Sequence, residues 1–151
     1  MNKIKVLLAL VCILLVSNVV LGLMLYRQNI QYDFLCENAD QIFKAHFSML
    51  ATHLNTACPE DENECMMWVQ EVKYLSGQCL SIFNLTSYAK NHNLQDIVLE
   101  LQSIALEWRE YPIGLIPREL AVDILELSHR LTDDEALLIK VREDLDQLYT
   151  P

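Results

Sequence analysis

Residue types that bind transition metals cluster once, in the stretch HFSMLATH between residues 46 and 53. His46, Met49 and His53 follow one another at intervals of three and four residues, so on a helix they share one side. Imidazole and thioether groups together suit copper, and imidazole also binds nickel and zinc. One interpretation of the stretch is therefore a metal site. The simpler alternative is packing, with both histidines at the margin of the buried face of the helix.

A second kind of chemistry belongs to the cysteines of the acidic stretch CPEDENEC, Cys58 and Cys65. Their spacing is wider than the close pairs of structural zinc sites, and the acids between them lack the glycine and ligand spacing of an EF-hand loop. If the stretch turns between two antiparallel helices, the two cysteines face each other across the turn. We therefore predict a disulfide, which would indicate an oxidising compartment.

Cys36 and Cys79 lie farther from this turn, about 33 Å and about 21 Å along their helices at 1.5 Å per residue. On two antiparallel helices these distances leave the two residues misaligned by about 12 Å. A disulfide requires Cα atoms within about 7 Å, so a bond between Cys36 and Cys79 is not expected. Cys79 falls on an apolar stripe and is predicted to be a core thiol. An alternative for Cys36, which lies near the membrane, is a disulfide that links two copies of the chain.

Trp108, Arg109 and Tyr111 lead into the proline-bounded stretch YPIGLIP. Tryptophan, arginine and tyrosine carry much of the binding energy of protein interfaces, so these residues are candidates for anchoring a partner. The alternative places Trp108 in the core and Arg109 in water. The sequence has no nucleophile elbow, HExxH motif, P-loop or dinucleotide-binding glycine pattern. A non-enzymatic protein is therefore predicted.

The N-terminal part of the chain indicates a location. Residues 6–26 are uncharged and mostly apolar, which is about the length that spans a bilayer. Lys3 and Lys5 precede this run, and upstream positive charge keeps an N-terminus in the cytoplasm. We expect residues 1–5 in the cytoplasm, residues 6–26 across the cytoplasmic membrane, and residues 27–151 outside it.

A cleaved signal peptide ending near Gly22 is the alternative, and it would release a secreted domain. The apolar run continues beyond Gly22, which favours an uncleaved signal anchor. Asn18 and Gly22 within the run form a loose version of the small-xxx-small pattern. They are candidates for association with another membrane helix, from a second copy or from a different protein.

Charge is distributed unevenly. The net charge is −10, and all 21 acidic residues follow the apolar run. An acidic surface repels nucleic acid and anionic lipid headgroups, so nucleic-acid binding is not expected. Such a surface would suit a cationic partner or metal ions, and the simpler interpretation is that it keeps the domain soluble.

Apolar residues recur at steps of three and four through the rest of the chain, which predicts helices. An all-α fold is expected, in which the transmembrane signal-anchor helix precedes an antiparallel bundle of four or five helices. Pro59 should stop the first outer helix, which continues from the membrane segment. Expected boundaries are residues 33–57, 61 to about 90, 93–108, 117–131 and 132 to the C-terminus, with N-caps at Asp61, Asn93 and Thr132.

These features together predict a non-enzymatic, single-span membrane protein. Its acidic extracytoplasmic domain would bind or regulate another membrane or envelope protein, or a second copy of itself, without a cofactor. Two alternatives stay open. One is an envelope metal sensor or buffer that binds copper, nickel or zinc through His46, Met49 and His53. The other is an enzyme whose site is not visible in the sequence.

Overall fold

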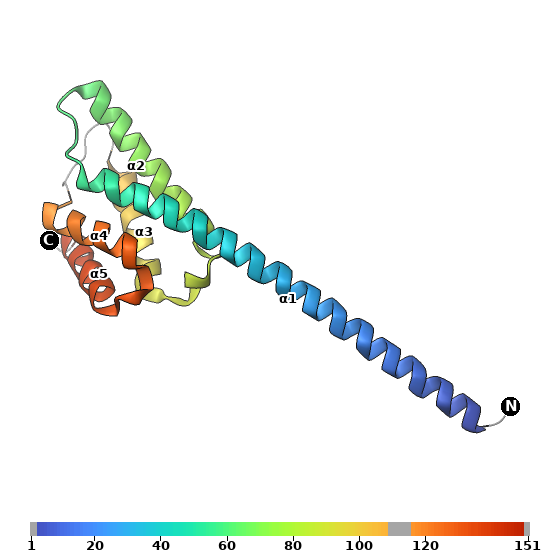
Figure 1. The fold of residues 1–151 in the computed structure, drawn as a ribbon. Helices are drawn as coiled ribbons and strands as arrows, with labels where there is room; N and C mark the ends of the chain where they lie inside the picture. The colour runs from blue at the N-terminus through green and yellow to red at the C-terminus, as the bar shows by residue number, and fades with distance from the viewer. Residues whose placement is uncertain (1–2, 109–115, 150–151) are drawn as a thin grey trace. The chain divides into compact units, whose positions relative to one another are not determined.

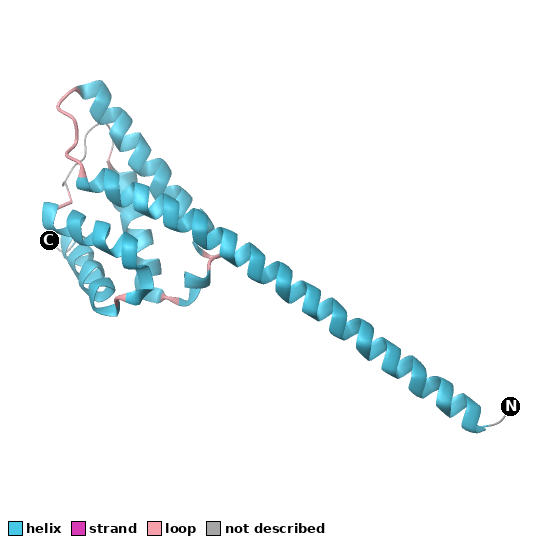
Figure 2. Ribbon diagram, viewed as in Figure 1, coloured by secondary structure: helices cyan, strands magenta, loops and turns pink. Residues whose placement is uncertain are grey.

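The computed structural model describes residues 3–108 and 116–149. Within these residues the fold is all-α, as the sequence predicts, and no strand occurs (Figures 1 and 2). The helices in chain order are α1 (Lys3–Asn55), α2 (Glu62–Phe83), the 3-10 helix η1 (Ser87–Lys90), α3 (His92–Glu107), α4 (Arg118–Arg130), the 3-10 helix η2 (Leu131–Asp133) and α5 (Glu135–Tyr149).

The chain divides into two compact units, Met1–Cys36 and Glu37–Pro151, and α1 contributes residues to both. In the first unit every described side chain from residue 13 to residue 35 is exposed, although most of those up to residue 26 are apolar. By length and composition α1 is able to cross a membrane. It is therefore the candidate span that the sequence predicts.

The second unit has a core built from the apolar stripes of all five α-helices. α3 packs against both α2 and α5, and α4 packs against α5. Phe43 lies at one end of this core, where its ring centroid is 5.6 Å from that of Phe47, 5.6 Å from that of Phe83 and 5.9 Å from that of Tyr88. Fully buried members of the core include Phe43, Phe47, Leu50, Phe83, Leu94, Ile97, Ile124, Leu127, Leu138 and Leu145.

The α1–α2 connection follows the sequence prediction. α1 ends at Asn55, before Pro59, which lacks the amide that a helix would require. Asp61 is the N-cap of α2, and its Oδ1 accepts hydrogen bonds from the backbone amides of Asn63 (3.0 Å) and Glu64 (3.1 Å). These bonds satisfy two of the amides that have no partner inside the helix.

Three predicted boundaries were wrong, and two of them lie between α2 and α3. Asn91, not Asn93, is the N-cap of α3, and its Oδ1 accepts from the amide of Leu94 at 2.9 Å. The preceding helix ends at Phe83, because the Thr86 hydroxyl donates to the Phe83 carbonyl and accepts from the amide of Tyr88. These local hydrogen bonds compete with helix continuation and begin η1 instead.

The N-cap of α5 is Asp134, not Thr132. Asp134 Oδ1 accepts from the amide of Leu137 at 3.0 Å, and Arg130 holds the other carboxylate oxygen at 2.9 Å. Leu131 ends α4 with a positive φ of 46°, which residues other than glycine rarely adopt. The chain therefore needs the short helix η2 to turn, and this moves the cap of α5 two residues along.

Candidate functional site

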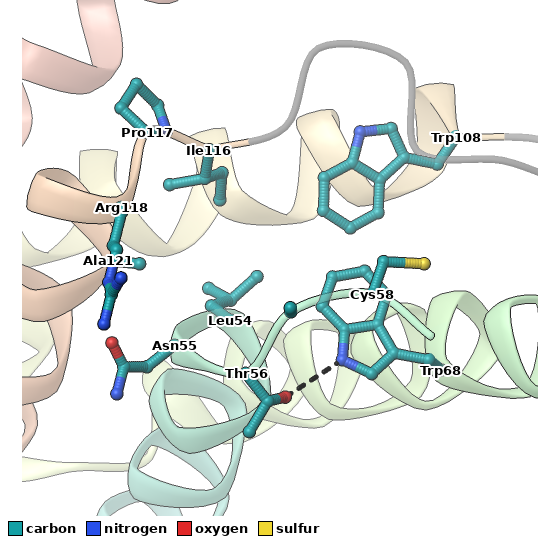
Figure 3. A pocket seen from close by; sticks show the side chains of 11 residues that line it. Leu54, Asn55, Thr56, Cys58, Trp68, Trp108, Ile116, Pro117, Arg118 and Ala121 are labelled. Carbon is teal, nitrogen blue, oxygen red and sulfur yellow. Dashed lines mark hydrogen bonds between the residues drawn. The ribbon is translucent and has the colours of Figure 1, made fainter. Parts of the chain in front are cut away.

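A cavity of about 550 Å³ in the second unit is a candidate site. It lies where the ends of α1 and α3 meet the beginnings of α2 and α4 (Figure 3). Its walls include the apolar side chains of Leu54, Trp68, Trp108 and Ile116. This volume falls within the range of small-molecule pockets, roughly 300–1,000 Å³.

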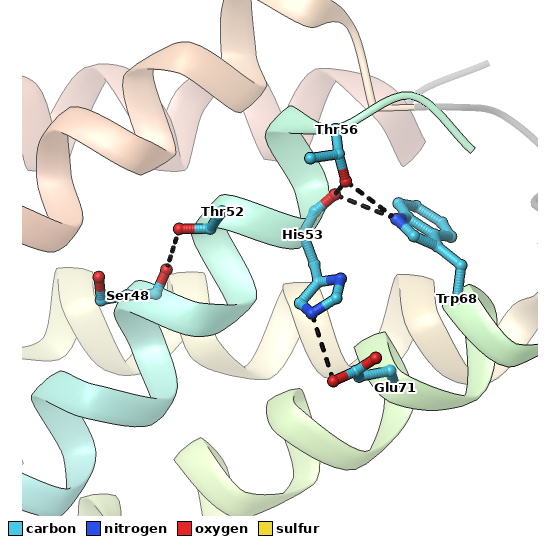
Figure 4. Close-up of polar contacts among 6 residues, drawn as sticks. All are labelled: Ser48, Thr52, His53, Thr56, Trp68 and Glu71. Carbon is cyan, nitrogen blue, oxygen red and sulfur yellow. Dashed lines mark hydrogen bonds and ion pairs between the residues drawn. The ribbon is translucent and has the colours of Figure 1, made fainter. Parts of the chain in front are cut away.

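The two indoles form one side of the cavity. Trp68 and Trp108 are the chain's only two tryptophans, and they stack with ring centroids 5.5 Å apart and an interplanar angle of 22°. Trp68 Nε1 donates to the carbonyl of His53 and to Thr56 Oγ1, both at 3.2 Å (Figure 4). Trp68 thereby fixes the end of α1 against the first turns of α2.

Trp108 is more deeply buried, with 1 % of its surface exposed against 9 % for Trp68. Its Nε1 is buried and has no hydrogen-bond partner among the described residues. Trp108 therefore belongs to the core, and it also forms part of the cavity wall. Arg109 and Tyr111, which the sequence groups with it as a partner anchor, lie outside the described residues.

Among the described residues, Arg118 is the only charged one that lines the cavity. It is exposed, it begins α4 directly after Pro117, and no ion pair involves it within residues 3–108 and 116–149. Arg118 also borders a second recess, which Glu119, Asp123 and Lys140 line as well, and there Lys140 Nζ lies 2.8 Å from Asp123 Oδ2. The part of the cavity that the structure describes therefore combines an aromatic region with a guanidinium that forms no ion pair there.

Of the three predicted metal ligands His46, Met49 and His53, only His53 lies close to a possible ligand from another helix. His53 Nε2 lies 3.3 Å from Glu71 Oε1 on α2 (Figure 4). Met49 is 49 % exposed, and His46 Nδ1 is buried without a hydrogen-bond partner among the described residues. No group of three or more histidine, cysteine or carboxylate ligands occurs in the described part of the chain. Glu71 was missed in the sequence because its contact depends on the α1–α2 register.

The cysteines are arranged as the spacing argument predicts. Cys58 and Cys65 form a disulfide, with Cα atoms 5.6 Å apart, and Cys36 and Cys79 are free. Burial raises the pKa of the Cys79 thiol to about 12, so this thiol stays protonated and unreactive. Cys36 is only half-buried, so reagents in the solvent can reach its thiol.

The outer side of α1 in the second unit was not recognised in the sequence. Ile42, Ala45, Met49 and Thr52 recur at steps of three and four residues, on the side of α1 away from the core. All four are exposed, Ile42 by 46 %. None of them carries a charge. We call this stripe the α1 outer face.

Asn18 and Gly22, the candidates for association within the membrane, lie on α1 in the first unit. Asn18 is exposed, and a Cβ added at Gly22 would meet no atom within 4 Å. Both positions are therefore open to another helix, so this prediction stays a prediction.

A cluster of acids and one arginine lies between α3 and α5. Arg142 Nε is 3.5 Å from Asp96 Oδ2 and 3.9 Å from Asp146 Oδ2. Burial, followed by a hydrogen bond to the Asp146 carboxyl, raises the pKa of Glu100 to about 7. Because these groups lie outside the cavity and pair with one another, we interpret the cluster as a contact between helices.

Comparison with protein-family models, curated proteins and solved structures finds no match to this chain.

Proposed function

We propose that this chain is a single-span membrane protein whose acidic helical domain lies outside the cytoplasm and binds a partner protein through the α1 outer face. The partner is a second membrane or envelope protein or another copy of the chain. The domain acts as an accessory or regulatory subunit, and its role is binding and not catalysis.

The observation that carries this proposal is the composition of the α1 outer face. All 21 acidic residues of the chain follow the apolar run, yet Ile42, Ala45, Met49 and Thr52 form an exposed stripe without charge. Depletion of charge and enrichment of methionine are typical of the central part of protein interfaces. An apolar helix face of this kind also offers the repeated anchors that a second helix packs against.

Two observations support the location. The exposed, uncharged side chains from residue 13 to residue 26 give α1 the composition of a span, and Lys3 and Lys5 favour a cytoplasmic N-terminus. The Cys58–Cys65 disulfide suits an oxidising compartment. A domain that follows such a span would meet its partner at or near the membrane surface.

Site-specific photo-crosslinking in the native membrane tests the proposal. A photoreactive amino acid at Ala45, on the α1 outer face, should give one discrete crosslinked band. The same amino acid at Gln147, exposed on α5, serves as the matched control and should give little. The mass of the Ala45 band separates a second copy from a different protein. Equal, diffuse labelling from both positions would contradict the proposal.

Metal binding is a second candidate function, favoured by the approach of His53 and Glu71 from two helices. Imidazole and carboxylate are both zinc ligands, and Met49 one turn before His53 would add a thioether for copper. Calorimetric titration of the full chain with zinc and with copper(I) tests it. Loss of a stoichiometric heat in His53→Gln and Glu71→Gln would support a site, whereas no heat in the wild type would exclude these metals.

A further inference from the structure

We infer that the cavity between Trp68, Trp108 and Arg118 is a binding site for a small monocarboxylate with an apolar body. This site goes beyond the proposed partner contact, because it lies at the ends of α1 and α3 and shares no residue with the α1 outer face. The ligand class follows from the volume of the cavity, the character of its walls and the position of Arg118.

The volume and the walls define the body of the ligand. About 550 Å³ is room for a small organic molecule rather than for a few waters. Leu54, Ile116 and the two indoles supply apolar surface, and an aromatic or alkyl group gains both burial and ring contacts there. Trp68 Nε1 is already engaged with His53 and Thr56, so this wall presents carbon to a ligand.

The charge defines the head group. Figure 3 shows the two indoles at one end of the cavity, and Arg118 and Asn55 together at the other. Guanidinium and carboxamide groups both donate hydrogen bonds to a carboxylate, and guanidinium does so through two parallel N–H groups. None of the described residues that line the cavity is acidic, although acids are nearly twice as numerous as basic residues in the chain.

These features select an anion with one charge. A second carboxylate on the ligand would lie against the apolar wall without a partner, and an uncharged ligand would leave the Arg118 guanidinium unpaired. A cationic ligand would be repelled by Arg118. The cavity therefore distinguishes ligands that have the same carbon skeleton and differ only in the head group.

The test uses the full chain in lipid nanodiscs and three probes with one skeleton: 4-phenylbutyrate, 4-phenylbutanamide and 4-phenylbutylamine. Intrinsic tryptophan fluorescence is the readout, because both tryptophans of the chain line the cavity. We expect 4-phenylbutyrate to produce a saturable change in emission. The amide should bind about tenfold more weakly or worse, and the amine should give no saturable change.

Two variants separate the site from general binding to protein or lipid. Arg118→Gln should weaken binding of 4-phenylbutyrate by about tenfold and leave the amide unchanged. Arg130→Gln, which removes the same charge from the other end of α4, should leave both unchanged. Arg118 is exposed, so its substitution should not affect folding.

Three results would overturn the inference. They are the absence of a saturable change with 4-phenylbutyrate in the wild type, equal affinity for anion and amide, and equal weakening by Arg118→Gln and Arg130→Gln. Photo-crosslinking from Ala45 does not depend on this cavity, so the outcome for the ligand leaves the test of the partner contact intact.

Discussion

Replacing Glu100 with glutamine should change how stability depends on pH. In the fold the Glu100 carboxyl is partly buried between α3 and α5, beside Asp146 and Asp96. Its pKa rises from 4.5 to about 7, chiefly through burial and then through the hydrogen bond to Asp146. Glutamine has the same shape, cannot ionise, and keeps a donor for the Asp146 carboxylate.

The direction of the pH dependence follows from how the folded and the unfolded chain bind the Glu100 proton. Below pH 4.5 both the folded and the unfolded chain hold the Glu100 proton, so this group does not alter stability. Between 4.5 and about 7 the unfolded chain releases its proton first, and the free energy of unfolding falls as pH rises. Above about pH 7 the ionised Glu100 carboxylate destabilises the fold by its full amount. Acidification from about pH 7 to pH 4.5 removes this destabilisation.

The difference between 4.5 and about 7 sets an upper limit of about 3 kcal/mol on this cost. Because the side chain is only partly buried, solvent screening reduces the expected value to about 1–2 kcal/mol. Glu100→Gln should therefore be more stable than the wild type by that amount at pH 8, and equally stable at pH 4.

Urea unfolding of the full chain in detergent, followed by circular dichroism from pH 4 to pH 8, measures the effect. Glu107→Gln is the matched control, since Glu107 lies exposed at the end of the same helix. The reasoning is refuted if the two variants show the same pH dependence, or if Glu100→Gln is the less stable protein at pH 8.

Three further predictions concern packing and the cysteines. The Cys58–Cys65 disulfide closes a loop with a sequence separation of only 7, so its reduction should lower the free energy of unfolding in urea by about 2.5 kcal/mol, and a Cys58→Ala, Cys65→Ala double variant should not respond to reductant. Phe47→Ala should cost about 3–5 kcal/mol, because Phe47 is fully buried and stacked on Phe43; a loss below about 1 kcal/mol would contradict its place in the core. Iodoacetamide should label Cys36 in the native protein and label Cys79 only after unfolding, which peptide mass mapping can check.

The fold could be predicted from the sequence because each helix has its own periodic apolar stripe and its own stop signal. Pro59 and Asp61 determine the α1–α2 connection within a few residues, and that connection brings Cys58 and Cys65 together. The errors in the predicted helix boundaries occur where more than one polar side chain could cap the same helix. Asn91 and Asn93 are both good caps, and in the structure it is Asn91 whose Oδ1 accepts from the amide of Leu94.

The cavity could not be predicted from the sequence. Trp68 and Trp108 are far apart in the chain, and each alone fits a core position on its own helix. Their stacking depends on how α3 packs against α2, and the approach of Arg118 depends on where α4 begins. Spacing within one helix carries no information about these contacts, so residues from four helices could not be grouped.

The α1 outer face was missed for a related reason. Sequence periodicity shows that α1 has apolar residues on two sides, around Phe43 and around Met49. It does not show which side the other helices cover. The structure buries the first and exposes the second, and this difference is what makes the second a candidate contact surface.

The most direct test of the partner contact is the yield of photo-crosslinking from Ala45 in the native membrane, compared between two charge-introducing variants. Met49→Glu places a carboxylate on the α1 outer face, whereas Met67→Glu makes the same change on α2, where the side chain is 70 % exposed. We predict that Met49→Glu abolishes the crosslinked band and that Met67→Glu leaves its yield unchanged. Equal yields from the wild type and both variants would contradict the proposal that this face binds a partner.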